Sequence, residues 1–172
     1  MDAVYGVGDG DYGLHLLTKE DERSWYNMVR HNATITYEAW DDKFKNNQDW
    51  NHAWGAAPAN IIPRWVVGVR PVEAGWRKMV IAPQIGNLKF ISAAVPTIKG
   101  EVKVDINYTL NGYGARISIP ANTEARVVLP AKSEVKELRI NGKKRAIRYA
   151  ENGNLDCGTM GSGDYLFSIS TK

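Results

Sequence analysis

A single glutamate, Glu38, lies among aromatic residues in the stretch 34–55, which reads TITYEAWDDKFKNNQDWNHAWG. Hydrolysis of a glycoside uses two carboxyl groups, one that protonates the leaving oxygen and one that activates water or attacks the sugar. A general base must stay ionised and reach a water molecule, which suits a carboxylate with polar neighbours. Glu38 is therefore the first candidate for proton transfer, and the alternative is a glutamate on the surface of a loop.

Histidine and tryptophan side chains in the same stretch are candidates for sugar binding. His52 lies close to where a helix is expected to begin, and a helix N-terminus disfavours the imidazolium. A neutral His52 could therefore hydrogen-bond a hydroxyl, although a backbone carbonyl could satisfy it equally. Trp40, Trp50 and Trp54 form either a sugar platform or packing between helix and loop, because indoles dominate cores. Their clustering around Glu38 favours the binding interpretation.

The remaining polar residues indicate no metal site and no cofactor. His15, His31 and His52 are too far apart for metal-ligand spacing, and an HExxH motif is absent. Cys157 is the only cysteine, which excludes an internal disulfide and a cysteine-based zinc site. We expect the adjacent Asp41 and Asp42 to cap a turn rather than to supply a second catalytic carboxylate.

Composition bounds the partners of the chain. Its 172 residues suit one domain, or one domain with part of another, and the formal charge of +3 gives no argument for nucleic acid binding. No apolar run approaches the ~20 residues of a membrane span. The first residues lack the features of a secretory signal, and the compartment is not indicated. The late run of cations around residues 136–148 is interpreted as the solvated face of a hairpin.

Helical periods occupy the first part of the chain. Residues 1–10 look like a frayed end, and a short helix is predicted over residues 12–17. Thr18 is expected to open a second helix, whose core face carries Trp25, Met28 and Val29 at i, i+3 and i+4. After the aromatic stretch, which we interpret as a loop, a third helix is predicted over residues 56–69. Its inward positions are Ala59, Ile62, Val66 and Val69.

From Arg77 onward the period of apolar residues changes to two, which is typical of strands. Asn-Gly pairs at 111–112 and 141–142 mark hairpin turns. About eight short strands separated by Gly, Pro and Asn turns predict an antiparallel β-sandwich. The predicted strands cover residues 78–82, 88–92, 101–108, 115–119, 125–129, 135–140, 145–149 and 165–169.

Two runs, ATITYEAWD at 33–41 and WNHAWGAAPANIIPRWVVGVRP at 50–71, resemble the bacterial alpha-L-rhamnosidase family of glycoside hydrolases. In that family a Thr-x-Trp-Glu-x-Trp-like motif is followed by Asn-His-aromatic-x-Gly and a helix that ends in Gly-x-x-Pro. DYGLHLLTKEDERSWYNMV upstream and WRKMVIAPQ downstream are also similar to family segments. The resemblance covers roughly residues 10–110. Tyr37 departs from it, because the family usually has Trp there, and the loop at 40–51 looks short.

The resemblance implies an α+β chain, in which the last helices of an (α/α)6 barrel over 1–75 precede a β-sandwich over 76–172. It implies hydrolysis of terminal alpha-L-rhamnose with inversion and without a metal. Glu38 then corresponds to the general base and His52 to a residue of the sugar pocket. Trp40 takes the family's second tryptophan position, and Trp54 is a further candidate for substrate binding.

The family's general acid lies upstream of the part that this sequence resembles. We therefore expect the tail of a longer enzyme, inactive alone, whose partners are a rhamnose-containing glycoside and the rest of the barrel. Self-association is expected through apolar helix faces exposed at Trp25, Met28, Ile62 and Val66. The alternative is a non-catalytic carbohydrate-binding or structural β-sandwich module. Few aromatic residues follow Trp76 to form a sugar platform, which disfavours that alternative.

Overall fold

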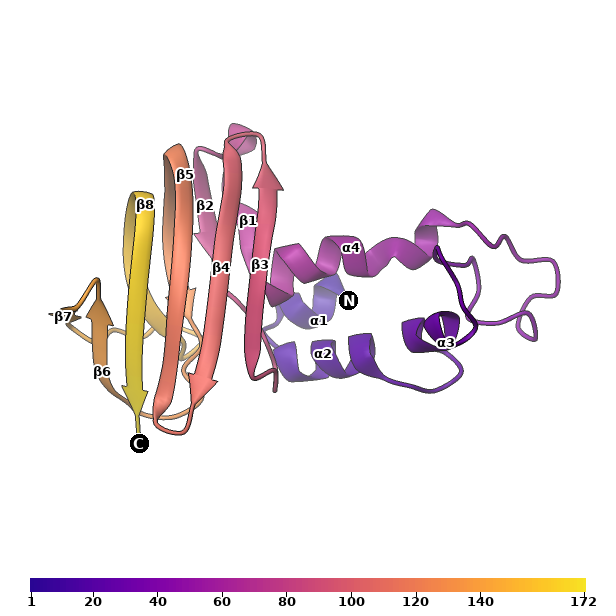
Figure 1. Ribbon diagram of the computed structural model, residues 1–172, viewed down its shortest axis with the longest axis horizontal. Helices are drawn as coiled ribbons and strands as arrows, with labels where there is room; N and C mark the ends of the chain where they lie inside the picture. The colour runs from indigo at the N-terminus through magenta and orange to yellow at the C-terminus, as the bar shows by residue number, and fades with distance from the viewer.

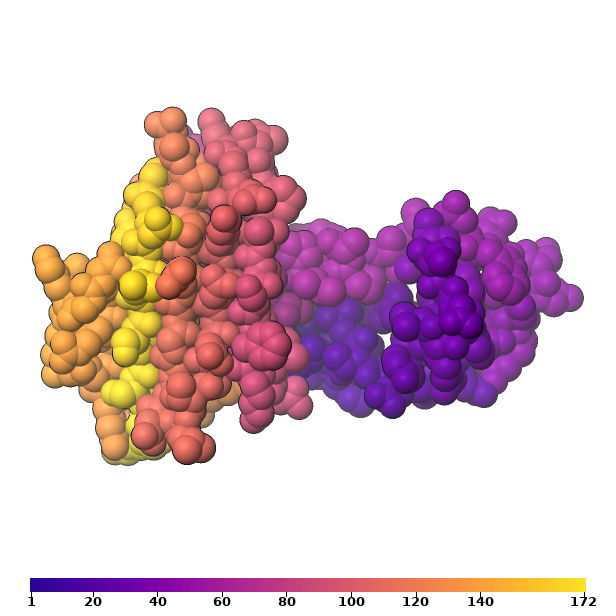
Figure 2. Space-filling model, in the orientation of Figure 1, coloured from indigo at the N-terminus to yellow at the C-terminus, as the bar shows by residue number.

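The computed structural model describes residues 1–172 as a helical part that extends sideways from a β-sandwich (Figures 1 and 2). The helical part contains short helices and turns only, and a long loop forms its outer end. None of the helices has the length and apolar character needed to span a membrane. The helical elements are α1 (Asp2–Gly6), α2 (Gly10–Thr18), α3 (Trp25–Arg30), η1 (Ala53–Ala56), α4 (Ala57–Ile61), η2 (Ile62–Val66) and η3 (Ala74–Trp76).

The sandwich confirms the predicted combination of helices followed by strands. Its strands are β1 (Val69–Pro71), β2 (Lys78–Ile81), β3 (Phe90–Thr97), β4 (Gly100–Thr109), β5 (Gly112–Leu129), β6 (Val135–Ile140), β7 (Lys143–Arg145) and β8 (Leu155–Thr171). Two long strands, β5 and β8, pair along their lengths and take part in both layers. The first part of β5 pairs with β4 and its last part with β2. The buried residues of both layers form one core.

The sandwich differs from the prediction in several places. The strands predicted at 88–92, 145–149 and 165–169 are β3 at 90–97, β7 at 143–145 and β8 at 155–171, and β1 was not predicted. The strands predicted at 115–119 and 125–129 belong to one strand, β5, whose ladder is interrupted between Ile119 and Glu124. Pro120 has no N–H for the ladder, and Asn122 adopts a left-handed φ of 58°. In addition, β2 runs parallel to β5, whereas the other strand pairs are antiparallel. The β3–β4 hairpin supplies the long connection that a parallel pair needs.

The N-terminal prediction was wrong in two places. Residues 2–6 form α1 rather than a frayed end, and fully buried Tyr5 packs with Ile61 and Val66. The second helix begins at Trp25 instead of Thr18, with Ser24 as its N-cap accepting the Asn27 N–H at 3.0 Å. Asp21 does not complete a capping box, because its carboxylate binds Lys19 and the Arg23 amide.

The third helix is shorter than predicted and turns a different face inward. Val69 lies in β1, and Ala59 and Ile62 are exposed while Ile61 is buried. The cause is Pro63, which has no N–H and shifts the helical phase through a π turn. In that turn Val67 N–H donates to the Ile62 carbonyl at 2.8 Å. Met28 and Val66, predicted to be exposed, are both buried, and Trp25 is half-buried.

The helical part joins the sandwich through polar contacts around the connection before β3. Gln84 donates its side-chain N–H to the Tyr5 carbonyl at 3.0 Å and its backbone N–H to the Trp65 carbonyl at 3.1 Å. Ala82 N–H donates to the Gly68 carbonyl at 2.9 Å. An apolar cavity of about 420 Å³ lies between α2, the α4–η2 segment and β3. These contacts place the loop at the end of the helical part away from the sheet (Figure 1).

Candidate active-site loop

Hydrogen bonds between its two ends close the loop that carries Glu38 and His52. His52 N–H donates to the Thr36 carbonyl at 2.8 Å, and the Thr36 hydroxyl donates to the His52 carbonyl at 3.0 Å. Two residues further on, Glu38 N–H donates to the Asp49 carbonyl at 2.9 Å. The segments around Glu38 and His52 therefore run side by side, although fourteen positions separate the two residues.

The Glu38 carboxylate is held by one cation and one backbone amide. Its Oε1 contacts the Lys45 ammonium, and its Oε2 accepts the Asp49 N–H at 3.1 Å. The hydrogen bond from Lys45 is the main cause of the lowered pKa of Glu38. The Asp49 amide lowers it further, and His52 does so to a smaller extent. The side chain is 15% exposed. Each oxygen can accept a further hydrogen bond, because a carboxylate has about four acceptor positions.

His52 caps the 3-10 turn η1 with its own side chain. Its Nδ1 accepts the Trp54 N–H at 3.2 Å, so Nδ1 carries no proton in this arrangement. The proton of the neutral ring then lies on Nε2, which is a hydrogen-bond donor. The imidazole also meets the Trp54 indole edge-on, with ring centroids 4.7 Å apart. The Trp54 side chain is 77% exposed, so it offers a wide apolar surface beside this donor.

The other two tryptophans of the loop lie in different surroundings. Trp40 packs edge-on against Trp25, with centroids 5.0 Å apart, and Trp25 Nε1–H donates to the Gly55 carbonyl at 2.6 Å. Trp50 is exposed and leans against the buried Tyr37 ring at 5.1 Å. Trp40 thus fixes the loop on α3, whereas Trp50 and Trp54 face solvent.

A buried amide, Gln48, organises the turn between Glu38 and Asp49. Gln48 is 6% exposed, its Oε1 accepts the Ala39 N–H at 3.0 Å, and its Nε2 donates to Asp42 at 2.7 Å. Asp41 accepts the Lys43 N–H at 3.1 Å, which closes the first bend. Both aspartates therefore bond within the turn, as the sequence predicted.

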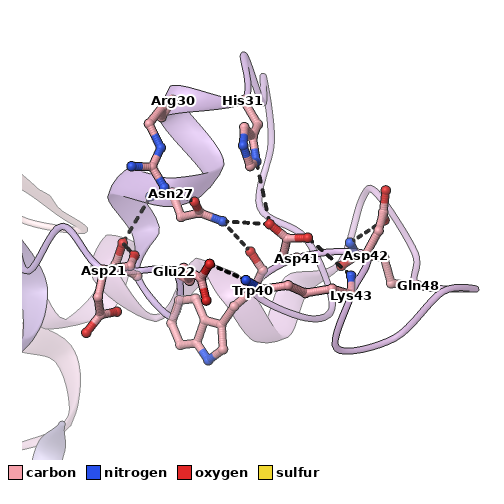
Figure 3. Close-up of polar contacts among 11 residues, drawn as sticks. Asp21, Glu22, Asn27, Arg30, His31, Trp40, Asp41, Asp42, Lys43 and Gln48 are labelled. Carbon is pink, nitrogen blue, oxygen red and sulfur yellow. Dashed lines mark hydrogen bonds and ion pairs between the residues drawn. The ribbon is translucent and has the colours of Figure 1, made fainter.

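Asn27 of α3 ties the loop to the helical part (Figure 3). Its side-chain amide is buried and donates to the Trp40 carbonyl at 3.0 Å and to Asp41 Oδ2 at 3.2 Å. Its own Oδ1 accepts a hydrogen bond from Arg30 at 2.5 Å. Lys43 pairs with Glu22, and His31 lies 3.8 Å from Asp41. The loop is thus anchored through side chains of the preceding helix and its approach.

The sequence did not identify several residues that shape the surroundings of Glu38. Lys45, Gln48 and the Asp49 amide all come from a polar run without a helical or strand period. No spacing rule assigns contacts inside such a run. No group of three or more His, Cys, Asp or Glu side chains is placed to hold a metal ion.

Comparison with known proteins identifies both parts of the chain. Residues 1–66 match the bacterial alpha-L-rhamnosidase 6 hairpin glycosidase domain, and residues 68–144 match the bacterial alpha-L-rhamnosidase C-terminal domain. An alpha-L-rhamnosidase of Alteromonas sp. (strain LOR) is 31% identical in an alignment of 143 residues that covers 76% of this chain and 15% of that protein. One of Streptomyces avermitilis is 25% identical over 95% of this chain and 16% of its own length.

Solved structures give the same result at the level of the fold. The alpha-L-rhamnosidase from Dictyoglumus thermophilum superposes with a TM-score of 0.88 at 27% identity, over 99% of this chain and 20% of that one. The Streptomyces avermitilis enzyme complexed with L-rhamnose superposes with a TM-score of 0.81 at 23% identity, over 95% of this chain and 16% of its own. The chain thus spans a small share of the length of its relatives. On these matches, it belongs to the bacterial alpha-L-rhamnosidase family.

Proposed function

We propose that this chain supplies the general base and part of the sugar-binding surface of an inverting alpha-L-rhamnosidase. The observation that carries the proposal is the carboxylate of Glu38, which is ionised, held at both oxygens and adjacent to His52. A carboxylate with unused lone pairs can bind a water molecule and accept its proton. The names of the relatives supply the substrate class, a rhamnoside.

In this reaction the water oxygen forms a bond to the anomeric carbon while the glycosidic C–O bond breaks. The proton of the water passes to Glu38, and a general acid protonates the leaving oxygen. That acid is not among the residues assigned here, and we place it in another part of the enzyme. The lowered pKa of Glu38 keeps it ionised at neutral pH.

The sugar contacts are proposed for His52, Trp54 and Trp40. The Nε2–H of His52 is free to donate to a ring hydroxyl, while its Nδ1 stays bound to the Trp54 amide. The exposed indole of Trp54 can cover the apolar side of the pyranose next to that donor. Trp40, packed on Trp25, would line the pocket with its remaining half-exposed surface.

This chain spans only 15% and 20% of the length of the Alteromonas and Dictyoglumus enzymes. We propose that residues 1–66 complete a barrel with helices outside this chain and that residues 68–172 form the attached sandwich. The sequence predicted the boundary at 75–76, but β1 pairs with β2 and Val69 belongs to the sandwich core. The apolar surface at Ile62 and Trp25 would pack against those helices or against a second copy. With acid and base acting in one transition state, we expect this chain alone to be inactive.

Glu38→Gln in an enzyme that contains this segment tests the assignment. We expect kcat to fall by about 10²–10⁴, the usual contribution of a positioned base, with KM for an aryl alpha-L-rhamnoside little changed. Glu22→Gln is the matched control, because Glu22 is exposed, pairs with Lys43 and carries the same charge. A Glu38→Gln enzyme that retains activity within about twofold of the wild type would remove Glu38 from the mechanism.

A further inference from the structure

A second cleft, of about 590 Å³, lies in the sandwich between the β6–β7 hairpin and the first half of β8. Figure 1 shows β6 and β7 at the end of the sandwich opposite the helical part, so the cleft is remote from Glu38. Its volume falls within the range of about 300–1,000 Å³ that small-molecule sites occupy. Buried Leu138, Ile140 and Met160 form its apolar lining, and Arg145, Arg148 and Thr159 supply polar groups.

The register of the hairpin divides its cations between two faces. Arg145 lies directly opposite the buried Leu138, so it shares the inward face of the hairpin with that residue. Lys144 lies opposite Arg139 on the other face, and both pair with Glu137. The two outward cations therefore share one carboxylate, whereas Arg145 makes no ion pair. Lys143 lies opposite Ile140 on the same face as Arg145, but it does not line the cleft. All the cations of this run are exposed, as the solvated-hairpin interpretation predicted, and Arg145 and Arg148 also border the cleft.

The acidic group in the cleft is already occupied. Asp156 binds Arg126 through its carboxylate at 2.8 Å and accepts the Gly158 N–H at 2.9 Å. Arg148, which also lines the cleft, forms no ion pair within 4.0 Å. Arg145 and Arg148 against Asp156 leave the lining of the cleft with one net positive charge. The carboxylate of Asp156 is already bonded to Arg126, so both guanidinium groups remain available for a ligand. Guanidinium groups bind carboxylates through two parallel hydrogen bonds, which makes them specific partners for that group.

Open backbone and one aromatic ring complete the lining. Gly158 and Gly161 line the cleft, and a Cβ placed on either would meet no atom within 4 Å. A ligand can therefore approach the main chain closely at both positions. The Tyr165 ring lies beside them, half-buried, and its hydroxyl donates to the Gly161 carbonyl at 3.2 Å. An apolar base with one aromatic ring and hydrogen-bonding groups around it suits a pyranose better than a compact inorganic anion.

We propose that this cleft binds a carboxylate-bearing sugar residue of an acidic polysaccharide, with Arg145 and Arg148 on the carboxylate. The ring of the sugar lies over Ile140 and Tyr165. The proposal rests on the proposed function for its choice of a carbohydrate ligand. The sandwich would then hold the polysaccharide at its acidic sugar while the loop around Glu38 acts on a rhamnoside at another position of the same polysaccharide.

Titration calorimetry of the 172-residue chain with trigalacturonate tests the site. We expect saturable binding that weakens at least about tenfold in Arg145→Ala/Arg148→Ala, since charge-assisted hydrogen bonds are the strong ones. The matched control is Lys136→Ala/Lys144→Ala, which removes the same charge from the same hairpin but does not touch the cleft. Fully methyl-esterified trigalacturonate, which keeps the sugars and loses the charge, is expected not to bind.

Equal binding by the arginine double variant and its control would overturn the proposal. Equal binding of the methyl ester, or complete displacement by equimolar inorganic phosphate, would also overturn it. Rhamnoside hydrolysis is a separate measurement, so failure of the Glu38 assignment would leave these titrations unchanged.

Discussion

The ammonium of Lys45 contacts the carboxylate of Glu38 seven positions earlier in the chain and is the main cause of its lowered pKa. Replacing Lys45 by Met should therefore raise the pKa of Glu38 toward its ordinary value. The Asp49 amide remains in the variant, so part of the lowering should persist. The titration is measured through the side-chain carboxyl carbon of Glu38 by NMR.

Lys43→Met is the control for this prediction, because Lys43 lies in the same turn but pairs with Glu22. A carboxyl whose pKa is lower in the folded than in the unfolded chain stabilises the fold above its unfolded pKa. That contribution is lost as pH falls through the folded pKa. Wild-type tryptophan fluorescence should therefore change at lower pH than that of Lys45→Met. Coincident transitions in the two proteins would contradict a role for Lys45.

Gln48 should determine the local stability of the loop, because both ends of its buried amide are bonded. Gln48→Met keeps the volume but leaves the Ala39 N–H and the Asp42 carboxylate without this partner, at a cost of about 1–3 kcal/mol. We expect hydrogen exchange of the Ala39 amide to accelerate by about 5–150-fold, which is the equivalent of that cost. Asn47→Ala, at an exposed neighbouring position, should leave the exchange unchanged.

The sequence predicted elements with a clear period and missed contacts that depend on distant segments. The alternation of apolar and polar residues predicted the bounds of β4 to within one residue at each end, because Val102, Val104 and Ile106 all face one core. The same reasoning failed after Ile61, where a proline-dependent π turn rotates the apolar face. A periodic pattern reports only the regular geometry, so a local change of helix type shifts every later position.

In the candidate site, too, residue types could be predicted from the sequence, whereas contacts between distant segments could not. Residue types alone selected Glu38 and His52, and the structure places their segments side by side through the Thr36 pairing. Sequence gave no signal for Lys45, because contacts inside an irregular turn follow from its particular closure. Asn27 was equally unmarked, since a helical asparagine usually faces solvent. Its burial results from the docking of the loop on α3.

Gly68 and Gly75 form a pair that separates backbone strain from close packing at the junction of the two parts. Both have left-handed φ, of 83° and 80°. A Cβ at Gly68 would lie 2.2 Å from the Ala82 backbone, whereas one at Gly75 would meet nothing within 4 Å. Gly75→Ala should cost about 1–2 kcal/mol from conformation alone. Gly68→Ala should lower the free energy of unfolding by clearly more, as measured by urea unfolding. Equal losses of stability in the two variants would show that the backbone around Gly68 shifts to make room for the Cβ.

Tyr108 and Tyr113 stack in the sandwich core with ring centroids 4.8 Å apart, but only one hydroxyl has a partner. Tyr113 donates to the Pro130 carbonyl at 2.6 Å, while the Tyr108 hydroxyl is buried without a hydrogen bond and burial raises its pKa to about 12.

Tyr113→Phe should lower the free energy of unfolding by about 1–3 kcal/mol, because it leaves a buried carbonyl unpaired. Tyr108→Phe removes an unpaired group and should be neutral or stabilising by up to about 1 kcal/mol. Both variants keep the stacked rings, so at equal m-values the difference between their urea midpoints reports the hydrogen bond of Tyr113 alone. Equal destabilisation by the two changes would mean that the Tyr108 hydroxyl also has a partner, such as an internal water molecule.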